Sequence, residues 1–142
     1  MIVIYTDGAC SKNPGGFGGW GAYIQERGKD IFLSGGDPST TNNKMEMTAV
    51  IEALKYYKTK KEITLYSDSM YVIKGITEWM DGWKKKSWKK VKNLDLWLEI
   101  DRMNQFHSVS WNHVRGHAGV EGNEIADRLA VMEKNKLKQS AK

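Results

Sequence analysis

Five short apolar runs along the chain predict β-strands. Each holds β-branched or aromatic residues over a length of four to six positions, which is typical of strands. They cover residues 2–6, 21–25, 31–34, 63–67 and 108–113. The sequence RGKD at residues 27–30 separates the second run from the third, and it predicts a hairpin turn between antiparallel strands.

Four longer segments repeat apolar residues at helical spacing. Such positions recur every three or four residues through residues 42–58, as at Met45, Ala49 and Ala53. The other predicted helices cover residues 69–80, 93–105 and 121–136. Strands separated by helices pair in parallel through right-handed crossovers, and a hairpin adds antiparallel edge strands. We therefore predict an α/β fold in which a mixed five-stranded sheet carries helices on both faces.

The length and composition indicate one soluble domain. With 142 residues, 40% of them hydrophobic and 27% charged, the chain can bury a core. We assign residues 1–136 to this domain and expect the polar residues 137–142 to fray. No apolar run approaches the roughly 20 residues of a membrane span, and a strand beginning at Ile2 leaves no room for a signal peptide. Cys10 is the only cysteine, which excludes an internal disulfide, so we expect a cytoplasmic protein with no membrane partner.

Two of the predicted strands end alike, in YTDG and YSDS, and so place Asp7 and Asp68 at their carboxyl ends. If the two strands are parallel neighbours, their backbones lie about 5 Å apart. Two ionised carboxylates at that separation repel by about 3 kcal/mol at an effective dielectric constant near 20, so the pair needs a cation or a shared proton. The alternative is structural: Asp68 caps a helix and Asp7 lies in a turn.

Two further acids fall at apolar positions of predicted helices. Glu46 shares a helix face with Ala49 and Ala53, where an unpaired carboxylate is costly. Asp127 precedes Ala130 by one turn, although a nearby arginine could neutralise it. Together with the two aspartates at the strand ends, these acids form a hypothetical acidic cluster. Oxygen ligands of high charge suit Mg²⁺ or Mn²⁺, and a pair of such ions can assist phosphoryl transfer, so the cluster favours a nuclease.

The charge pattern favours a polyanionic partner. The formal net charge is +5 and the pI is near 9.2, although lysine-rich surfaces also serve solubility. Residues 79–93, WMDGWKKKSWKKVKN, interleave tryptophans with lysines that include Lys84, Lys85 and Lys86. Lysines can follow phosphates while indoles pack on sugars or bases. The alternative is a lysine-covered helix whose tryptophans belong to the core.

Five segments in succession resemble the signature segments of type I ribonuclease H. They are YTDGACSKNPG, TTNNKMEMTAV, LYSDSMYVIKGITEW, WKKVKNLDLW and VRGHAGVEGNEIADRLA. The resemblance covers nearly the whole chain and implies the ribonuclease H fold of a bacterial-type, single-domain enzyme. It also implies endonucleolytic hydrolysis of the RNA strand of RNA/DNA hybrids by two-metal-ion catalysis, which leaves 3′-hydroxyl and 5′-phosphate ends.

The same resemblance assigns roles to individual residues. Asp7, Glu46, Asp68 and Asp127 are similar to the family's four catalytic, metal-binding carboxylates, which hold two Mg²⁺ ions, with Mn²⁺ as a substitute. His117 resembles the family histidine that assists proton transfer or product departure. From the sequence pattern alone, His117 is a surface loop histidine.

Substrate contacts are also implied by the resemblance. Thr41 and Asn93 resemble parts of a pocket for a DNA-strand phosphate, and Trp79 resembles an aromatic contact to the DNA sugars. Other residues resemble those that meet the minor groove, where 2′-hydroxyls distinguish RNA from DNA. These are Cys10, Asn13, Asn42, Asn43 and Met70. The alternatives are a small buried hydrophobe for the cysteine and helix N-capping for the two neighbouring asparagines.

The chain departs from the family pattern at two places. Many relatives have an arginine where this chain has Ser39, and residues 88–91 form a shorter segment than in relatives with a full basic protrusion. Both departures bear on the strength of hybrid binding and leave the chemistry intact. We expect a monomer without an obligatory protein partner. A non-catalytic hybrid- or RNA-binding module and a DNA-cutting nuclease of the same fold are the alternatives.

One glycine-rich segment matches a motif of another class of protein. Residues 16–21, GFGGWG, match the pattern G-x-G-x-x-G of dinucleotide-binding loops. The residues that follow, AYIQ, alternate like a strand, whereas a dinucleotide site needs a helix N-terminus there. We therefore predict a backbone turn at residues 16–21.

Overall fold

The computed structural model describes residues 1–12, 15–116 and 119–140. The strands are β1 Ile2–Cys10, β2 Gly16–Glu26, β3 Lys29–Thr40, β4 Glu62–Ser67 and β5 Ser108–His113. The helices are α1 Asn42–Lys55, α2 Met70–Lys74, a π-helical segment Gly75–Trp79, α3 Met80–Lys85, α4 Leu94–Phe106 and α5 Glu121–Ser140. Within the described residues, no helix is both long and apolar enough to cross a membrane.

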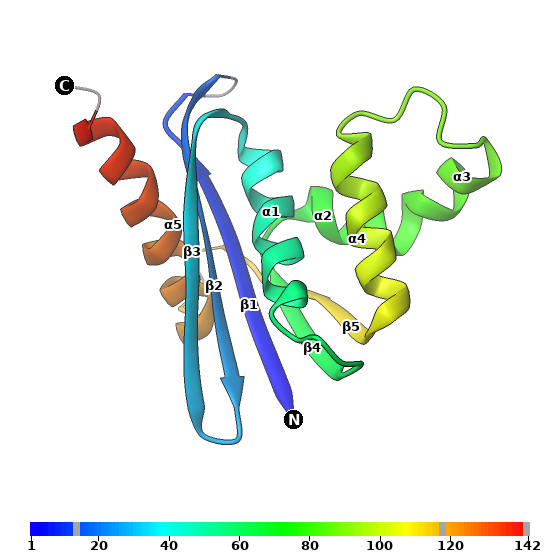
Figure 1. The fold of residues 1–142 in the computed structure, drawn as a ribbon, viewed down its shortest axis with the longest axis horizontal. Helices are drawn as coiled ribbons and strands as arrows, with labels where there is room; N and C mark the ends of the chain where they lie inside the picture. Colours follow the sequence, from blue (N-terminus) through cyan, green and yellow to red (C-terminus); the bar gives the residue numbers. More distant parts are fainter. Residues whose placement is uncertain (13–14, 117–118, 141–142) are drawn as a thin grey trace.

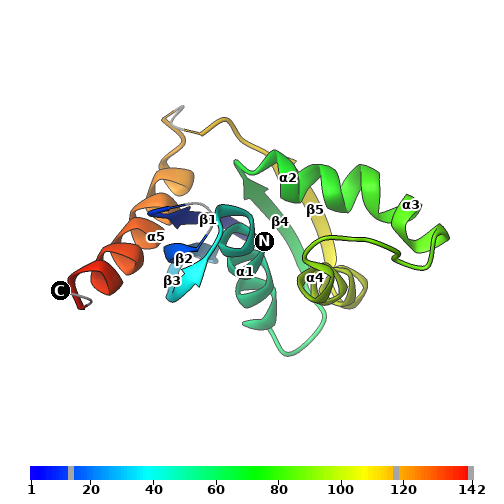
Figure 2. The same cartoon turned by 90° about the horizontal axis from the view of Figure 1, so that it is seen from above.

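All five strands join in one sheet of order β3-β2-β1-β4-β5. β1 pairs antiparallel with β2, and β2 with β3, whereas β4 runs parallel to both β1 and β5. Helices α1 and α4 lie on one side of the sheet and α5 lies on the other (Figure 1, Figure 2). The predicted α/β fold, with a mixed sheet and helices on both faces, is confirmed.

The main hydrophobic core fills the space between the sheet, α1 and α4. Ile4 and Leu65 on neighbouring strands are fully buried, and so is Trp97 on α4. Full burial of a large apolar side chain stabilises the fold by roughly 1.5–3 kcal/mol. Gly75 packs directly on this indole, because a Cβ at position 75 would lie only 2.0 Å from the ring of Trp97. The π-helical segment begins at this contact.

The predicted turn at residues 16–21 was wrong, because this segment belongs to β2. The prediction relied on β-branched residues, and this glycine-rich part of the strand contains none. Gly19 and Gly21 lie under α5, where a Cβ would come within 2.1 Å of the Ala130 carbonyl oxygen and 2.5 Å of the Ala126 carbonyl oxygen, respectively. The glycines therefore let the last helix approach the sheet closely.

The helix boundaries differ from the prediction by more than one residue at three places. α1 ends at Lys55, before the predicted residue 58, and the buried Tyr57 just beyond it donates a hydrogen bond of 2.9 Å to Glu26. The predicted helix 69–80 is interrupted by the π-helical segment and then continues as α3 to Lys85. α5 continues past the predicted residue 136 to Ser140. The domain boundary at residue 136 stays a prediction.

A buried histidine ties three segments together at the end of the sheet where β4 begins. His107 follows α4 and is 2% exposed. Its Nδ1 accepts a hydrogen bond of 3.1 Å from the Lys61 backbone N–H, and its Nε2 lies 2.9 Å from the Leu54 carbonyl oxygen. Nε2 therefore carries the proton and donates. The neutral ring satisfies two backbone groups that burial would otherwise leave unpaired.

Candidate metal centre and nucleic-acid interface

Three carboxylates from separate elements meet at the carboxyl end of the parallel strands. Asp7 lies in β1, Asp68 follows β4, and Glu46 comes from the first half of α1. β1 and β4 pair in parallel up to Thr6 and Ser67, so the two aspartates occupy the next positions of neighbouring strands. One oxygen of each of the three carboxylates lies within 4.8 Å of the others. The structure thus brings together three of the four predicted cluster residues at short range.

Asp127 adjoins this group from the opposite face of the sheet. It is half-buried on α5, and its carboxyl group lies close enough to that of Asp7 to raise the pKa of Asp7. Gly21 makes this approach possible, because it is the partner of Asp7 in the β1–β2 register and lies directly under α5. Asp127 therefore adjoins the group through Asp7 and lies outside the three carboxylates that are within 4.8 Å of one another.

Backbone contacts at Gly8 fix the position of Glu46. The Gly8 N–H donates a short hydrogen bond to Glu46 Oε1, and a second, of 2.9 Å, to Asp7 Oδ1. A Cβ at Gly8 would lie 2.4 Å from the backbone nitrogen of Glu46, so any larger residue would push α1 away from β1. On the other side of the site, a Cβ at Gly116 would lie 3.0 Å from Asp68 Oδ2.

These glycines shape the candidate site, and sequence reasoning missed them. The sequence held one indication of them: Gly8 directly follows Asp7 in YTDG, and Gly116 directly precedes His117 in RGHAG. A glycine within a motif does not reveal which side chain it must accommodate.

Burial gives the cluster its electrostatic character. Asp7 is 4% exposed and Glu46 is 7% exposed. Burial is the largest cause that raises the pKa of both carboxyl groups, and their contact with each other raises the pKa of Asp7 further. Glu46 Oε2 is buried and has no hydrogen-bond partner among the described residues. A buried carboxylate oxygen without a donor calls for a proton or a cation.

The predicted substrate residues next to this cluster have varied surroundings. Thr41 caps α1, and its Oγ1 accepts a hydrogen bond of 3.1 Å from the Lys44 N–H, while Asn42 and Asn43 are exposed in the first turn. Cys10 is half-buried, with its Sγ 3.0 Å from the Lys12 carbonyl oxygen. Met70 begins α2 and is largely exposed. Asn13 and His117 lie outside the described residues.

A cleft of about 420 Å³ opens between the N-terminal ends of α1 and α4. Asn93 lines it together with Thr40 and Lys44, two residues that the sequence prediction missed. The Asn93 amide donates a hydrogen bond of 3.1 Å to the Tyr71 hydroxyl, and its φ of 58° places the backbone in the left-handed region at the start of α4. The asparagine is thereby fixed against α2.

The basic segment divides into a packed part and an exposed part. Trp79 is 39% exposed and packs against Tyr71 and Trp83. Lys84 forms an ion pair of 2.8 Å with Asp101 on α4. Lys85 and the next residue, Lys86, are exposed and form no ion pair with any residue that the structure describes. The lysines that were predicted as one group thus differ in how far they are available to a ligand.

The family model for RNase H matches residues 1–135. The chain belongs to the ribonuclease H family.

Curated relatives and solved structures agree with this membership. The chain is 52% identical over 134 residues to a Ribonuclease H of Polynucleobacter asymbioticus, an alignment covering 91% of this chain and 86% of the relative. It is 53% identical to a Ribonuclease H of Cupriavidus necator, with 91% and 92% covered. It is also similar to the crystal structure of LC9-RNase H1, a type 1 RNase H with the type 2 active-site motif, at 31% identity and a TM-score of 0.87 over 96% of this chain and 72% of that one.

Without bound metal, the buried cluster should destabilise this ribonuclease H family member, and removing one of its carboxylates should stabilise the protein. Asp7→Asn removes one of three crowded carboxylates, and we expect a gain of about 2 kcal/mol in EDTA near pH 8, or roughly 4–8 °C in Tm. The pKa of Asp7 is higher in the folded state than in the unfolded state. The contribution of this carboxyl group to the stability of the fold is therefore fully present below the unfolded-state pKa, and it is lost as the pH rises towards the folded-state pKa. The gain should therefore grow between pH 5 and pH 9.

Thermal unfolding followed by circular dichroism measures this gain. Asp81→Asn is the matched control, because Asp81 is an exposed acid on α3 outside the cluster. An Asp7→Asn protein that is less stable than the wild type in EDTA at every pH would contradict the electrostatic account.

Proposed function

We propose that this protein is an endonuclease that hydrolyses the RNA strand of RNA/DNA hybrids and leaves 3′-hydroxyl and 5′-phosphate ends. The observation that carries the proposal is the buried group of Asp7, Glu46 and Asp68, in a chain that belongs to the ribonuclease H family. Further support comes from curated relatives with the name Ribonuclease H at more than half identity. One structure of the same fold, LC11-RNase H1, was solved in complex with an RNA/DNA hybrid.

The residues present fit a divalent metal. Three carboxylates provide hard oxygen ligands within 4.8 Å of one another, and the unpartnered Oε2 of Glu46 is buried next to them. We infer that two Mg²⁺ ions, or Mn²⁺ in their place, are held by Asp7, Glu46, Asp68 and Asp127. When bound, such ions supply activation of a water molecule and stabilisation of the charge on the leaving oxygen.

The chain's own groups would hold and orient the reacting phosphodiester. The Gly8 N–H keeps Glu46 turned towards Asp7, so the ligands are organised before the substrate arrives. We expect Asp7 to be the central metal ligand, because it adjoins acids from both faces of the sheet. His117, which precedes α5 in the sequence, would move a proton or assist product departure.

Hybrid recognition would use the surface around this group. We propose that Thr41 and Asn93 bind a DNA-strand phosphate and that Trp79 contacts the DNA sugars. Minor-groove contacts would come from Cys10, Asn13, Asn42, Asn43 and Met70. The exposure of the last three residues and of the Trp79 ring supports these roles. We expect the enzyme to act as a monomer in the cytoplasm, without an obligatory protein partner.

The experiment that tests the proposal is cleavage of an end-labelled RNA strand in several contexts. The RNA is presented in an RNA/DNA hybrid, in an RNA duplex, as a single strand, and as one ribonucleotide in a DNA duplex, each with Mg²⁺ or EDTA. We expect cutting only in the hybrid and only with metal. Asp7→Asn and Asp68→Asn should each lower kcat at least about 100-fold, because metal-assisted charge stabilisation is worth several kcal/mol and 1.36 kcal/mol is tenfold in rate.

Asp81→Asn again serves as the control and should cut at the wild-type rate. Tight hybrid binding without any cutting would point to a non-catalytic module. Metal-dependent cutting of a DNA duplex would point to a DNA nuclease. A folded Asp68→Asn protein with wild-type activity would refute the site.

The lysines of the basic segment make a second test of substrate binding. Replacing both Lys85 and Lys86 by alanine should raise KM with little change in kcat and should reduce the slope of log KM against log salt by about one for each lost phosphate contact. Lys84→Ala is the matched comparison: it breaks the ion pair with Asp101 and should act mainly on stability. A double variant with an unchanged salt slope would assign this segment to the solvated surface instead.

A further inference from the structure

One tyrosine hydroxyl joins α2 to α4 beside the proposed active site. Tyr71 is the second residue of α2 and follows Asp68 by three positions. Its oxygen accepts a hydrogen bond of 3.1 Å from the side-chain amide of Asn93 and another of 3.2 Å from Nε1 of Trp97. Asn93 directly precedes α4, and Trp97 belongs to that helix. The hydroxyl therefore connects a helix that starts at the carboxylate cluster with a helix that borders the 420 Å³ cleft.

The side chain of Asn93 has an unusual arrangement for the start of a helix. Its backbone lies at φ 58° and ψ 37°, a left-handed conformation that asparagine adopts more readily than most residues. Its carbonyl oxygen accepts the first helical hydrogen bond, of 3.0 Å, from the Trp97 N–H. An asparagine at this position usually caps the helix with its side chain, but that of Asn93 makes no such bond. The amide is turned to Tyr71 instead.

The charges around the cleft make the position of this amide important. Among the described residues that line the cleft, Lys44 is the one cation, whereas Asp37 and Asp95 are acids. Carboxylates next to a phosphate weaken its binding, so neutral donors must be well placed to hold one there. Asn93 lines the same cleft, and its amide nitrogen carries two N–H groups. One N–H can thus bind Tyr71 while the other serves a ligand.

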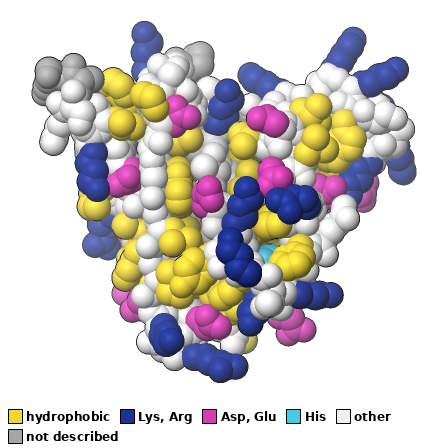
Figure 3. Space-filling view, in the orientation of Figure 1, with side chains coloured by type: hydrophobic (Ala, Val, Ile, Leu, Met, Phe, Trp, Pro, Cys, Tyr) yellow, Lys and Arg dark blue, Asp and Glu magenta, His cyan; other side chains and the backbone are white. Residues whose placement is uncertain are grey.

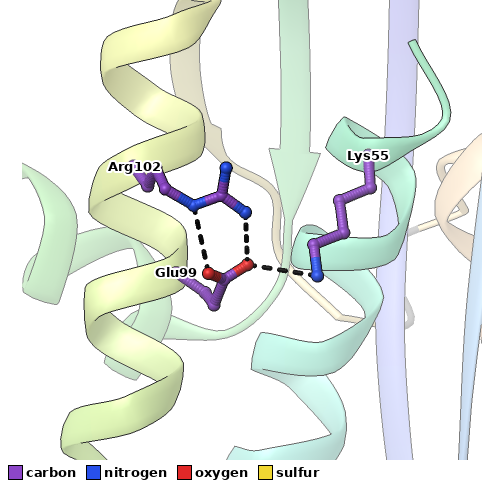
Figure 4. Close-up of polar contacts among 3 residues, drawn as sticks. All are labelled: Lys55, Glu99 and Arg102. Atoms are coloured by element: carbon purple, nitrogen blue, oxygen red, sulfur yellow. Dashed lines mark hydrogen bonds and ion pairs between the residues drawn. The ribbon is translucent and has the colours of Figure 1, made fainter. Parts of the chain in front are cut away.

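Helix α4 is held in place by contacts other than the Tyr71 hydroxyl. The indole of Trp97 is fully buried and packs on Gly75. Further along α4, Glu99 accepts hydrogen bonds of 3.1 and 2.9 Å from Arg102 and forms a 3.1 Å ion pair with Lys55 of α1 (Figure 4). Loss of the hydroxyl should therefore release the side chain of Asn93 without displacing the helix.

The ring of Tyr71 is fixed by aromatic neighbours. Its centroid lies 6.0 Å from that of Trp79 and 5.4 Å from that of Trp97. Both of these tryptophans also contact Trp83. Figure 3 shows hydrophobic side chains gathered next to α3, with lysine or arginine side chains around them. Because the ring is held from two sides, Tyr71→Phe removes the hydrogen bonds and keeps the packing.

We propose that Tyr71 is a positioning residue for substrate binding, and that its hydroxyl holds the Asn93 amide in the orientation that binds a phosphate of the DNA strand. The inference rests on the proposed function, because the phosphate belongs to the hybrid. Tyr71 acts through Asn93 and does not itself touch the substrate. The alternative is purely structural: the hydroxyl serves only as the acceptor for the buried Trp97 N–H, which would be costly to leave unpaired.

Steady-state cleavage of the hybrid tests this role. Tyr71→Phe should raise KM about fivefold and leave kcat within about twofold, because one hydrogen bond contributes roughly that factor to binding. Asn93→Ala should raise KM by at least as much. The double variant should match Asn93→Ala, because a hydroxyl that acts only through Asn93 then has nothing left to position. An unchanged KM in Tyr71→Phe, or a further rise in the double variant, would overturn the proposal.

A neutral phosphate analogue identifies the group that Asn93 binds. One methylphosphonate is placed at successive positions of the DNA strand, and binding of each labelled hybrid is measured by anisotropy in EDTA, where no cleavage is expected. We expect one position at which the analogue weakens binding to the wild type about fivefold and binding to Tyr71→Phe less than about twofold. Equal losses for the two proteins at every position, or no loss at any position, would leave only the structural role.

Tyr57→Phe is the matched control for lost stability. It also removes a hydroxyl hydrogen bond, the 2.9 Å bond to Glu26, from a buried tyrosine that lies beyond the end of α1 away from the cleft. It should lower the Tm, as Tyr71→Phe does by leaving the Trp97 N–H unpaired, but KM should stay at the wild-type value. A KM raised equally in this control would show that lost stability causes the effect, and would refute the positioning role.

The two proposals fail in different ways. A wild-type protein that cuts no hybrid would refute the proposed function, and the binding measurements in EDTA would still test Tyr71. A wild-type protein that cuts the hybrid, together with a Tyr71→Phe variant of unchanged KM, would refute the role of Tyr71 alone.

Discussion

The constraint that the rest of this structure must accommodate is the repulsion among clustered carboxylates, two of which are buried. Three acids with oxygens within 4.8 Å of one another are held where water is nearly excluded from two of them. Any two such charges repel by a few kcal/mol, a large fraction of the 5–15 kcal/mol by which folded domains are stable. The arrangement persists because the surrounding fold over-determines it, and a cation would turn the repulsion into attraction.

The parallel pairing of strands and the positions of two glycines hold these acids together. β1 and β4 are neighbours, so Asp7 and Asp68 cannot separate without breaking the sheet. Gly8 admits α1 on one face and Gly21 admits α5 on the other, which brings Glu46 and Asp127 to the same strand end. The core beneath, which contains the fully buried Trp97, anchors α4 and the π-helical segment against the sheet. Favourable burial in the core thus offsets the strain at its edge.

The sequence was sufficient for the parts of the fold that rest on side-chain pattern. Branched apolar runs located the strands, and the repeated strand ends placed Asp7 beside Asp68. Other features of the structure depend on tertiary contacts, which leave no pattern in the local sequence. The strand at residues 16–21 lacked branched residues because α5 needs the space above Gly19. The continuation of α5 beyond residue 136 follows the contact of Leu137 with Gly36, since a Cβ there would lie 2.9 Å from the leucine side chain. Likewise, only the structure shows that Lys84 is paired with Asp101.

The central claim is that the carboxylate group is a cation site organised in advance. Paramagnetic broadening of backbone amide NMR signals by substoichiometric Mn²⁺ tests it most directly, because broadening falls off steeply with distance from the bound ion. The account predicts that the amides of Gly8, Glu46 and Ser69 broaden first and that this selectivity is lost in Asp7→Asn. Broadening spread evenly over exposed acids such as Asp30 and Asp81, with Gly8 unaffected, would contradict it.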